Sequence, residues 1–171
     1  MRMKTMRSVS AAIIAATLCC ACAPAGAAAS RGGLSQESGA QVVVGAARPE
    51  LYVPVLKGKR IALMSNQTGM VGDRHSLDVM LENGLDVRLI YSPEHGFRGT
   101  ADAGEEVGSS VDGRTGIRIQ SLYGSGEAID LSDIDVVVVD IQDVGLRYYT
   151  YYVTMLKLMN KALEYGREFV I

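Results

Sequence analysis

Four consecutive valines, residues 136–139, constrain the fold of this chain more than any other feature. Such a run cannot alternate between core and solvent, so it predicts a strand covered on both faces, which is typical of the centre of a parallel sheet. The run ends abruptly in Asp140, Gln142 and Asp143. Open α/β sheets bind their ligands in the crevice outside the carboxyl ends of the strands. The sequence therefore predicts an α/β fold with a polar ligand site at this strand end.

Other strands and helices alternate around the valine strand. Strands are expected at 60–65, 87–91, 117–120 and 169–171, and helices at 75–83 and 149–165. The first two of these strands are expected to lie parallel to the valine strand in one sheet. The second helix is expected to bury one apolar face, formed by Tyr152, Met155, Leu156, Met159 and Leu163. This alternation predicts a doubly wound parallel sheet, which we expect to be truncated at the C-terminus because its last strand has no exit.

Residues 1–27 have the pattern of a signal peptide. Basic residues stand at the start, an apolar run covers 9–18, and small residues follow. This pattern predicts export, to the periplasm or the cell envelope. The sequence allows two ways of processing this leader. Lipidation at Cys22 or Cys20, which we favour, would anchor the protein to a membrane, whereas cleavage after Ala27 would release it.

Composition restricts the chemistry of the exported part. All three cysteines lie in the leader, so the mature chain can form neither a disulfide nor a thiolate metal site. The near balance of 17 basic and 19 acidic residues gives no reason to expect nucleic acid as a partner. Residues 28–50, which begin with a segment rich in Ala, Gly and Ser, are expected to be a flexible tether. The folded domain is then expected at 51–171.

Three predicted strands deliver polar side chains to one edge of the sheet. Asn66 and Gln67 follow the first strand, Glu94 and His95 follow the second, and Asp140 ends the third. Amides and carboxylates of this kind are typical of sites for hydroxyl-rich small molecules. Two carboxylates in one crevice can divide into a general acid and a partner that stays ionised.

Each of these residues also has a structural alternative. Glu94 alone is more often solvated or a helix cap, His95 alone is more often a hydrogen-bonded structural residue, and Asp140 can cap the next helix. The convergence of three strand ends favours a site over these separate roles.

Motifs for other chemistries are missing from the sequence. It has no Gly-x-Gly-x-x-Gly that opens a helix after a strand, no phosphate-binding loop and no Gly-x-Ser-x-Gly nucleophile motif. With His75 and His95 as the only histidines, a histidine-rich zinc site is not available.

Five motifs resemble one known family. They are Ser65–Gly69, Ser92–Gly99, Ala103–Glu105, Ser121–Gly124 and the stretch from Asp140 to Met155. In order and content they are similar to the exo-lytic β-N-acetylmuramidases, the NamZ-like family of peptidoglycan-recycling glycosidases. The resemblance implies a Rossmann-like catalytic domain followed by a smaller C-terminal domain, with 51–171 as the N-terminal part of the former. It implies release of N-acetylmuramic acid from the non-reducing end of peptidoglycan fragments, without a metal or organic cofactor.

The resemblance also implies roles for individual residues. It makes Glu94 the general acid/base and places Asp140 and Asp143 with it as catalytic candidates. Arg98 and Glu105 belong to a glycine-rich loop, 97–116, that we expect to cover the bound sugar. Residues expected to bind the muramyl saccharide are Asn66, Gln67, His95, Arg98, Glu105, Gln142, Arg147, Tyr149 and Tyr151. The alternatives are a non-catalytic wall-binding lipoprotein and a sugar-modifying transferase.

Overall fold

A six-stranded sheet forms the centre of the computed structural model, which describes residues 42–99, 108–124 and 128–171. Its strand order is β5-β6-β4-β1-β7-β8. The strands are β1 (Arg60–Ser65), β4 (Asp86–Ser92), β5 (Ser110–Val111), β6 (Arg118–Ser121), β7 (Val136–Asp140) and β8 (Glu168–Val170). Only β5 among these six strands runs antiparallel to its neighbour. The three strands predicted to be parallel neighbours, β4, β1 and β7, are confirmed.

The connections between the strands divide the sheet at β1 and β7. Counted along the chain, the five parallel strands lie in the order 3-2-1-4-5, which is the order of a Rossmann-like, doubly wound sheet. From β1 the chain passes through α2 (Ser76–Glu82) to β4, and from β7 it passes through α3 (Tyr151–Glu164) to β8 on the other side. The carboxyl ends of β1 and β7 therefore form the topological switch point, where such sheets bind ligands.

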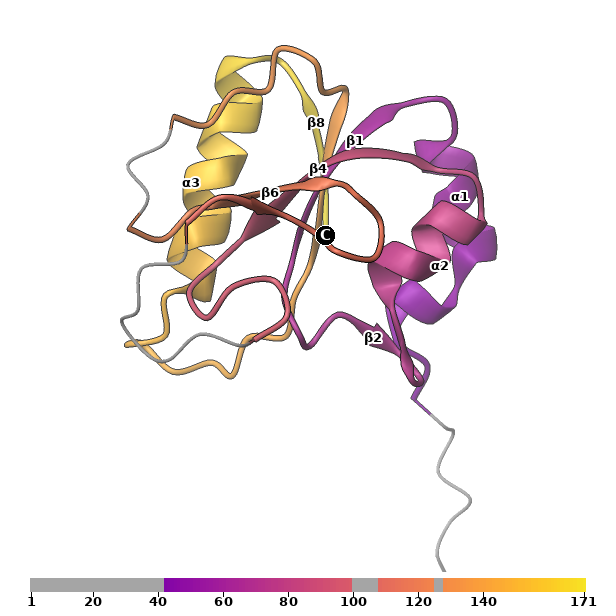
Figure 1. Ribbon diagram of the computed structural model, residues 1–171, viewed down its shortest axis with the longest axis horizontal. Helices are drawn as coiled ribbons and strands as arrows, with labels where there is room; N and C mark the ends of the chain where they lie inside the picture. The colour runs from indigo at the N-terminus through magenta and orange to yellow at the C-terminus, as the bar shows by residue number, and fades with distance from the viewer. Residues whose placement is uncertain (1–41, 100–107, 125–127) are drawn as a thin grey trace, which may run out of the picture. The chain divides into compact units, whose positions relative to one another are not determined.

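Helices cover both faces of the sheet, as the valine run predicts. Helices α1 (Pro49–Leu56) and α2 lie on one face and α3 on the other (Figure 1). Val136 and Val138 belong to the core beneath α1 and α2, whereas Val137 and Val139 pack with Leu158 of α3. All four valines are buried, so each face of β7 contributes to a core.

The buried face of α3 differs from the prediction. Tyr152 is 43% exposed, whereas Tyr151 is 6% exposed. The residues that α3 buries are Tyr151, Thr154, Leu158 and Ala162. Thr154 can be buried because its hydroxyl donates to the carbonyl of Thr150 at 3.1 Å. The buried face thus combines two large side chains, Tyr151 and Leu158, with two small ones, Thr154 and Ala162.

Several short elements were not expected from the sequence. A 3₁₀ turn at Gly45–Ala47 and helix α1 begin before residue 51, so helical structure reaches into the region predicted as tether. Pro49 starts α1, where its missing N–H costs nothing, but Pro54 inside the helix argues against a helix on sequence grounds. A hairpin of β2 (Met70–Val71) and β3 (Arg74–His75) precedes α2.

The leader, its cysteines and the first part of the tether lie outside the described residues. In the part of the chain that the structure does describe, no helix has the length and apolar character needed to cross a membrane.

Candidate active site

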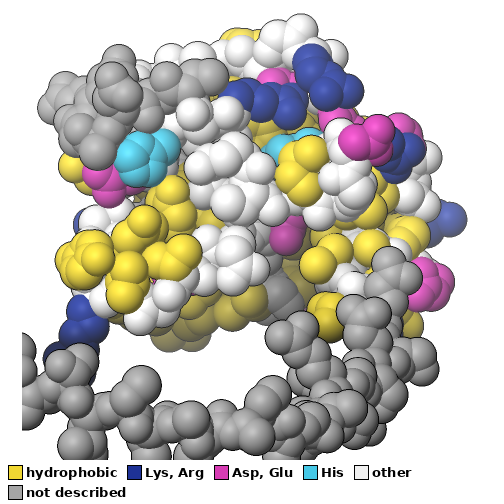
Figure 2. Space-filling view, turned by 90° about the horizontal axis from the view of Figure 1, so that it is seen from below, with side chains coloured by type: hydrophobic (Ala, Val, Ile, Leu, Met, Phe, Trp, Pro, Cys, Tyr) yellow, Lys and Arg dark blue, Asp and Glu magenta, His cyan; other side chains and the backbone are white. Residues whose placement is uncertain are grey.

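Polar residues occupy the ends of four neighbouring parallel strands. β6, β4 and β1 end in Ser121, Ser92 and Ser65, which are fully buried, and β7 ends in Asp140. The register pairs Ser65 with Asp140 and Ser92 with Ser121, so the four residues lie side by side. Seen from this edge, Figure 2 shows a hollow with an acidic side chain inside it, bordered by white surface on one side and by apolar surface on the other.

Asn66 and Gln142 are joined at the switch point through Thr68. The side-chain oxygen of Asn66 accepts hydrogen bonds from the backbone N–H of Thr68 at 3.0 Å and from its hydroxyl at 2.7 Å. The same hydroxyl accepts from the backbone N–H of Gln142 at 2.9 Å. These bonds fix the orientation of the Asn66 carboxamide, whose nitrogen is buried without a partner.

His75 fixes the backbone of Asn66 through a hydrogen bond. Its Nδ1 accepts from the backbone N–H of Leu77 at 3.1 Å and so caps α2. The ring proton of the neutral imidazole therefore lies on Nε2, which donates to the carbonyl of Asn66 at 2.8 Å. Burial lowers the pKa of His75, against the effect of the Asn66 hydrogen bond, and Arg98 lowers it further. His75 is thus held neutral as a structural support of the site.

Glu94 and His95 lie in a tight turn after β4. The backbone N–H of Gly96 donates to the carbonyl of Pro93 at 3.1 Å, which closes the turn around them. His95 has φ = 72°, a left-handed conformation that is rare outside glycine and clusters at functional sites. The hydroxyl of Thr150, at the start of α3, donates to Glu94 Oε2 at 2.7 Å. Glu94 is therefore anchored on the α3 side of the edge.

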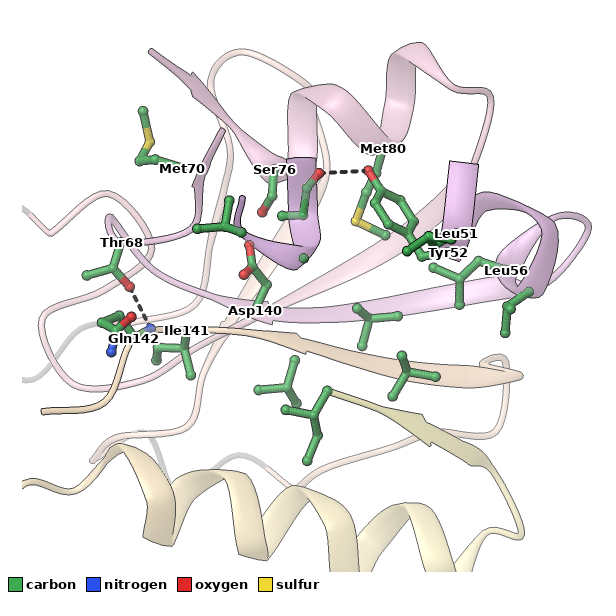
Figure 3. Close-up of a pocket in the computed structure, with 18 residues that line it drawn as sticks. Leu51, Tyr52, Leu56, Thr68, Met70, Ser76, Met80, Asp140, Ile141 and Gln142 are labelled. Carbon is green, nitrogen blue, oxygen red and sulfur yellow. Dashed lines mark hydrogen bonds between the residues drawn. The ribbon is translucent and has the colours of Figure 1, made fainter. Parts of the chain in front are cut away.

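Asp140 faces the opposite side, toward α2. A cavity of about 620 Å³ lies there between α1, α2, β7 and β8 (Figure 3). Asp140 and Ser76 line it together, and Figure 3 shows the carboxylate directed toward Ser76. Burial and the charges of Asp140 and Glu50 raise the pKa of Tyr52, another residue of this lining. Glu94 is held by Thr150 next to α3, whereas Asp140 lines the cavity next to α1 and α2, so the two carboxylates face different parts of the crevice.

Gly69 packs closely beneath Asp140. A Cβ atom at this position would lie 2.3 Å from Ser65 Oγ, 2.9 Å from Asp140 Oδ2 and 3.2 Å from Ser76 Oγ. Three side-chain oxygens thus converge on the glycine, and only a residue without a side chain leaves room for them.

Arg98 is paired with Asp112. Its guanidinium donates to both carboxylate oxygens, with Nη2 at 2.9 Å and 3.1 Å, and stacks on the Phe97 ring at 4.8 Å. Asp112 is 3% exposed. Burial opposes ionisation, but hydrogen bonds from Thr115 and Arg98 outweigh it and lower the pKa of Asp112. The two ends of the predicted cover loop are therefore tied together, while Glu105 lies outside the described residues.

The loop between β7 and α3 holds the remaining predicted residues. Asp143 accepts from the backbone N–H of Gly145 at 2.6 Å, and Gln142 donates to the carbonyl of Asp143 at 2.9 Å. Tyr149 stacks edge to face on Tyr151 at 6.0 Å, and Tyr151 is buried as part of the core. Arg147 is exposed. Gln67, in the turn after β1, packs against Gly99.

Unpaired polar atoms gather at this edge. Six buried side-chain polar atoms in the described residues lack a hydrogen-bond partner, and one of them, on Asp78, still has an Arg114 nitrogen at 3.2 Å. The other five lie at the carboxyl edge, on Asn66, Ser76, Ser92, Asp140 and Asp143. Native proteins leave few such groups, and each one requires an explanation. A bound polar molecule would supply the missing partners.

Sequence reasoning missed several residues of this site. Thr68, Ser76, His75 and Thr150 build it, yet none stands out by type or spacing. A polar residue directly after a strand or at a helix start was the available signal. Within the described ranges, no group of three or more His, Cys, Asp or Glu side chains is arranged to hold a metal ion.

Strand order and edge chemistry define the class of this domain as a Rossmann-like α/β domain with polar side chains gathered at its switch point. Residues 61–171 match the family model described as exo-beta-N-acetylmuramidase NamZ, N-terminal. The chain belongs to this family.

Known relatives agree with this assignment. The chain is 44% identical over 126 residues to the peptidoglycan beta-N-acetylmuramidase NamZ of Bacillus subtilis (strain 168), which covers 70% of this chain and 30% of that protein. Two crystal structures of DUF1343 family proteins from Bacteroides fragilis NCTC 9343 are also similar. The first has 46% identity and a TM-score of 0.65 over 77% of this chain and 34% of its own. The second has 36% identity and a TM-score of 0.63 over 72% and 32%. The chain thus spans about a third of the length of these relatives.

Proposed function

We propose that the protein is an exo-acting β-N-acetylmuramidase and that this chain carries the N-terminal part of its Rossmann-like catalytic domain. Its substrate would be a peptidoglycan-derived muramyl saccharide, from whose non-reducing end it releases N-acetylmuramic acid. Family membership supports a glycosidase of this kind. The observation that carries the proposal is the set of five unpaired polar atoms at the carboxyl edge of the sheet, which a hydroxyl-rich ligand would satisfy.

Glu94 is the general acid in this proposal. Cleavage of a glycosidic bond needs a proton on the leaving oxygen, and a positioned carboxyl group supplies it. The turn after β4 holds the Glu94 backbone, and the Thr150 hydroxyl holds one carboxyl oxygen at 2.7 Å. Such fixation lets a side chain meet the same substrate atom in every turnover. Asn66, with its carboxamide oxygen fixed by Thr68, keeps its side-chain nitrogen as a hydrogen-bond donor for the sugar.

The isosteric change Glu94→Gln tests this role in the full-length protein. The amide keeps an oxygen that accepts from Thr150, so folding and sugar binding should be unchanged. Turnover of a natural disaccharide should fall by about 10² to 10⁴, the usual contribution of one general acid. The deficit should shrink for a nitrophenyl muramide, whose leaving group needs less protonation.

Glu164→Gln, at an exposed position on α3, is the matched control and should leave turnover unchanged. If Glu94→Gln turns over the natural disaccharide as fast as the parent protein, Glu94 is not the general acid. Binding of the sugar without any turnover by the parent protein would instead favour a non-catalytic wall-binding protein.

We also propose that the protein is exported and anchored by a lipid at Cys22 or Cys20. The support is the basic, then apolar, then small-residue pattern of residues 1–27. Incorporation of a labelled fatty acid, lost when Cys19, Cys20 and Cys22 are changed to serine, is the expected result. Absence of label in the parent would favour release after Ala27.

A further inference from the structure

The cavity between α1, α2 and β7 combines one polar end with apolar walls. Asp140 Oδ2 and Ser76 Oγ lie at the polar end, both buried and without a hydrogen-bond partner. Ser76 is 2% exposed. Apolar side chains form much of the remaining wall, among them Leu51, Leu56, Met80 and Val138. Of the described residues that line the cavity, Asp140 alone is charged.

This lining selects for one kind of chemical group. A carboxylate oxygen without a partner requires a hydrogen-bond donor, and a buried serine hydroxyl can donate to a carbonyl. The charge of Asp140 disfavours an anionic group such as the lactyl carboxylate of muramic acid. The apolar walls favour an alkyl tail. A secondary amide with a short alkyl chain has all of these features.

We propose that Asp140 and Ser76 bind the 2-acetamido group of the sugar, with its methyl group pointing into the cavity. Asp140 accepts from the amide N–H, and Ser76 donates to the amide carbonyl. This inference rests on the proposed muramidase function and assigns the part of the site that recognises the N-acyl substituent. Glu94, on the α3 side of the edge, then approaches the glycosidic oxygen from the other direction.

The size of the cavity leads to an unusual specificity. About 620 Å³ is within the range of whole small-molecule pockets and is far larger than a methyl group requires. N-propanoyl and N-butanoyl muramides should therefore be accepted by the full-length protein. Their kcat/KM should equal that of the N-acetyl substrate or exceed it by up to about fourfold for each added methylene. A loss of tenfold or more per methylene would overturn the proposal.

The acyl series also separates this inference from the proposed function. A protein that hydrolyses the N-acetyl substrate but rejects longer chains remains a muramidase with a different acyl pocket. A protein that neither binds nor hydrolyses any muramide contradicts both proposals.

Ser76→Ala tests the polar end without disturbing the fold. The hydroxyl makes no hydrogen bond within the protein, so its removal should leave the unfolding temperature unchanged or slightly higher. The affinity for N-acetylmuramic acid, measured by calorimetry, should fall by about 3- to 10-fold, the value of one neutral hydrogen bond. Ser110→Ala, at an exposed serine of β5, is the control. Unchanged affinity in Ser76→Ala would contradict the assigned contact.

A ligand analogue tests the role of Asp140. Replacing the amide nitrogen by an ester oxygen removes the donor and places a lone pair against the carboxylate. The parent should bind this ester at least about 10-fold more weakly than the amide, since a charged acceptor loses its donor. Asp140→Asn carries its own N–H₂ donor and should reduce this discrimination. Equal discrimination in the parent and the variant would show that Asp140 does not contact the amide.

Discussion

Replacement of Gly69 by alanine should damage both stability and binding. The new Cβ would lie 2.3 Å from Ser65 Oγ and 2.9 Å from Asp140 Oδ2, and Cβ atoms in proteins do not approach other heavy atoms this closely. Ser65 is fully buried at the end of β1, so it has no open space into which to move. Overpacking of this kind costs about 1 to 3 kcal/mol in the free energy of unfolding. For a chain of this size the unfolding temperature should then fall by about 3 to 10 °C.

The measurement is thermal unfolding together with calorimetric titration of N-acetylmuramic acid. Because Asp140 must shift, the affinity should fall even at temperatures where the variant is folded. Gly113→Ala is the matched control, since its Cβ would meet no atom within 4 Å, and its effect should stay within about 0.5 kcal/mol. If Gly69→Ala and Gly113→Ala unfold at the same temperature and bind equally well, the three oxygens do not converge on Gly69.

Two further changes test the charges around the site. Because folding lowers the pKa of His75, the unfolded chain binds a proton at this residue more readily than the folded chain does. Its contribution to stability is complete above the unfolded pKa of about 6.5 and is lost as the pH falls below it toward the folded value. His75→Gln, whose amide keeps one acceptor and one donor but does not titrate, should flatten the dependence of stability on pH between 7 and 5, and an unchanged slope would refute this. Asp112→Asn should lower the free energy of unfolding by about 2 kcal/mol at pH 7, because Arg98 loses its partner. This difference in stability should shrink in acid, because below its lowered pKa Asp112 of the parent protein also becomes protonated and loses its charge. A difference that stays constant with pH would argue against the ion pair.

The central sheet could be predicted because its signals are local and strong. Four valines in a row can be satisfied only by a strand with two covered faces, and the alternation of strand and helix sets the parallel order. The buried face of α3 could not be predicted in the same way. Apolar residues lie all around this helix, so spacing alone does not distinguish the face of Tyr151 from that of Tyr152. The choice depends on which residues fit closely against the sheet, and the face that does so includes Ala162 and Thr154, which an apolar pattern does not single out, beside Tyr151 and Leu158.

The candidate site was predictable in position but not in detail. Strand ends locate the edge, and Asn66, Glu94 and Asp140 all lie there. Their division between two sides of the edge depends on side-chain direction, which the sequence does not specify for residues in turns. The support from His75 depends on a hydrogen bond to Asn66 across a hairpin that sequence patterns did not indicate, and Thr68 is joined to Gln142, 74 positions further along the chain.

The register of β7 against β1 decides which helices Asp140 faces. Side chains along a strand alternate with a period of two, so the pairing of Ser65 with Asp140 fixes the carboxylate on the side of α1 and α2. A slip of one residue would turn it toward α3. The four valines alone do not prevent this slip, since valines would still fill the cores on both sides of the sheet. The backbone N–H and the guanidinium of Arg60, at the start of β1, donate to the carboxylate of Asp135, directly before β7, and these bonds fix the alignment of the two strands. Substitution of Asp135 should therefore alter the chemistry of the crevice from the opposite end of the sheet, by loosening the alignment of one strand with its neighbour.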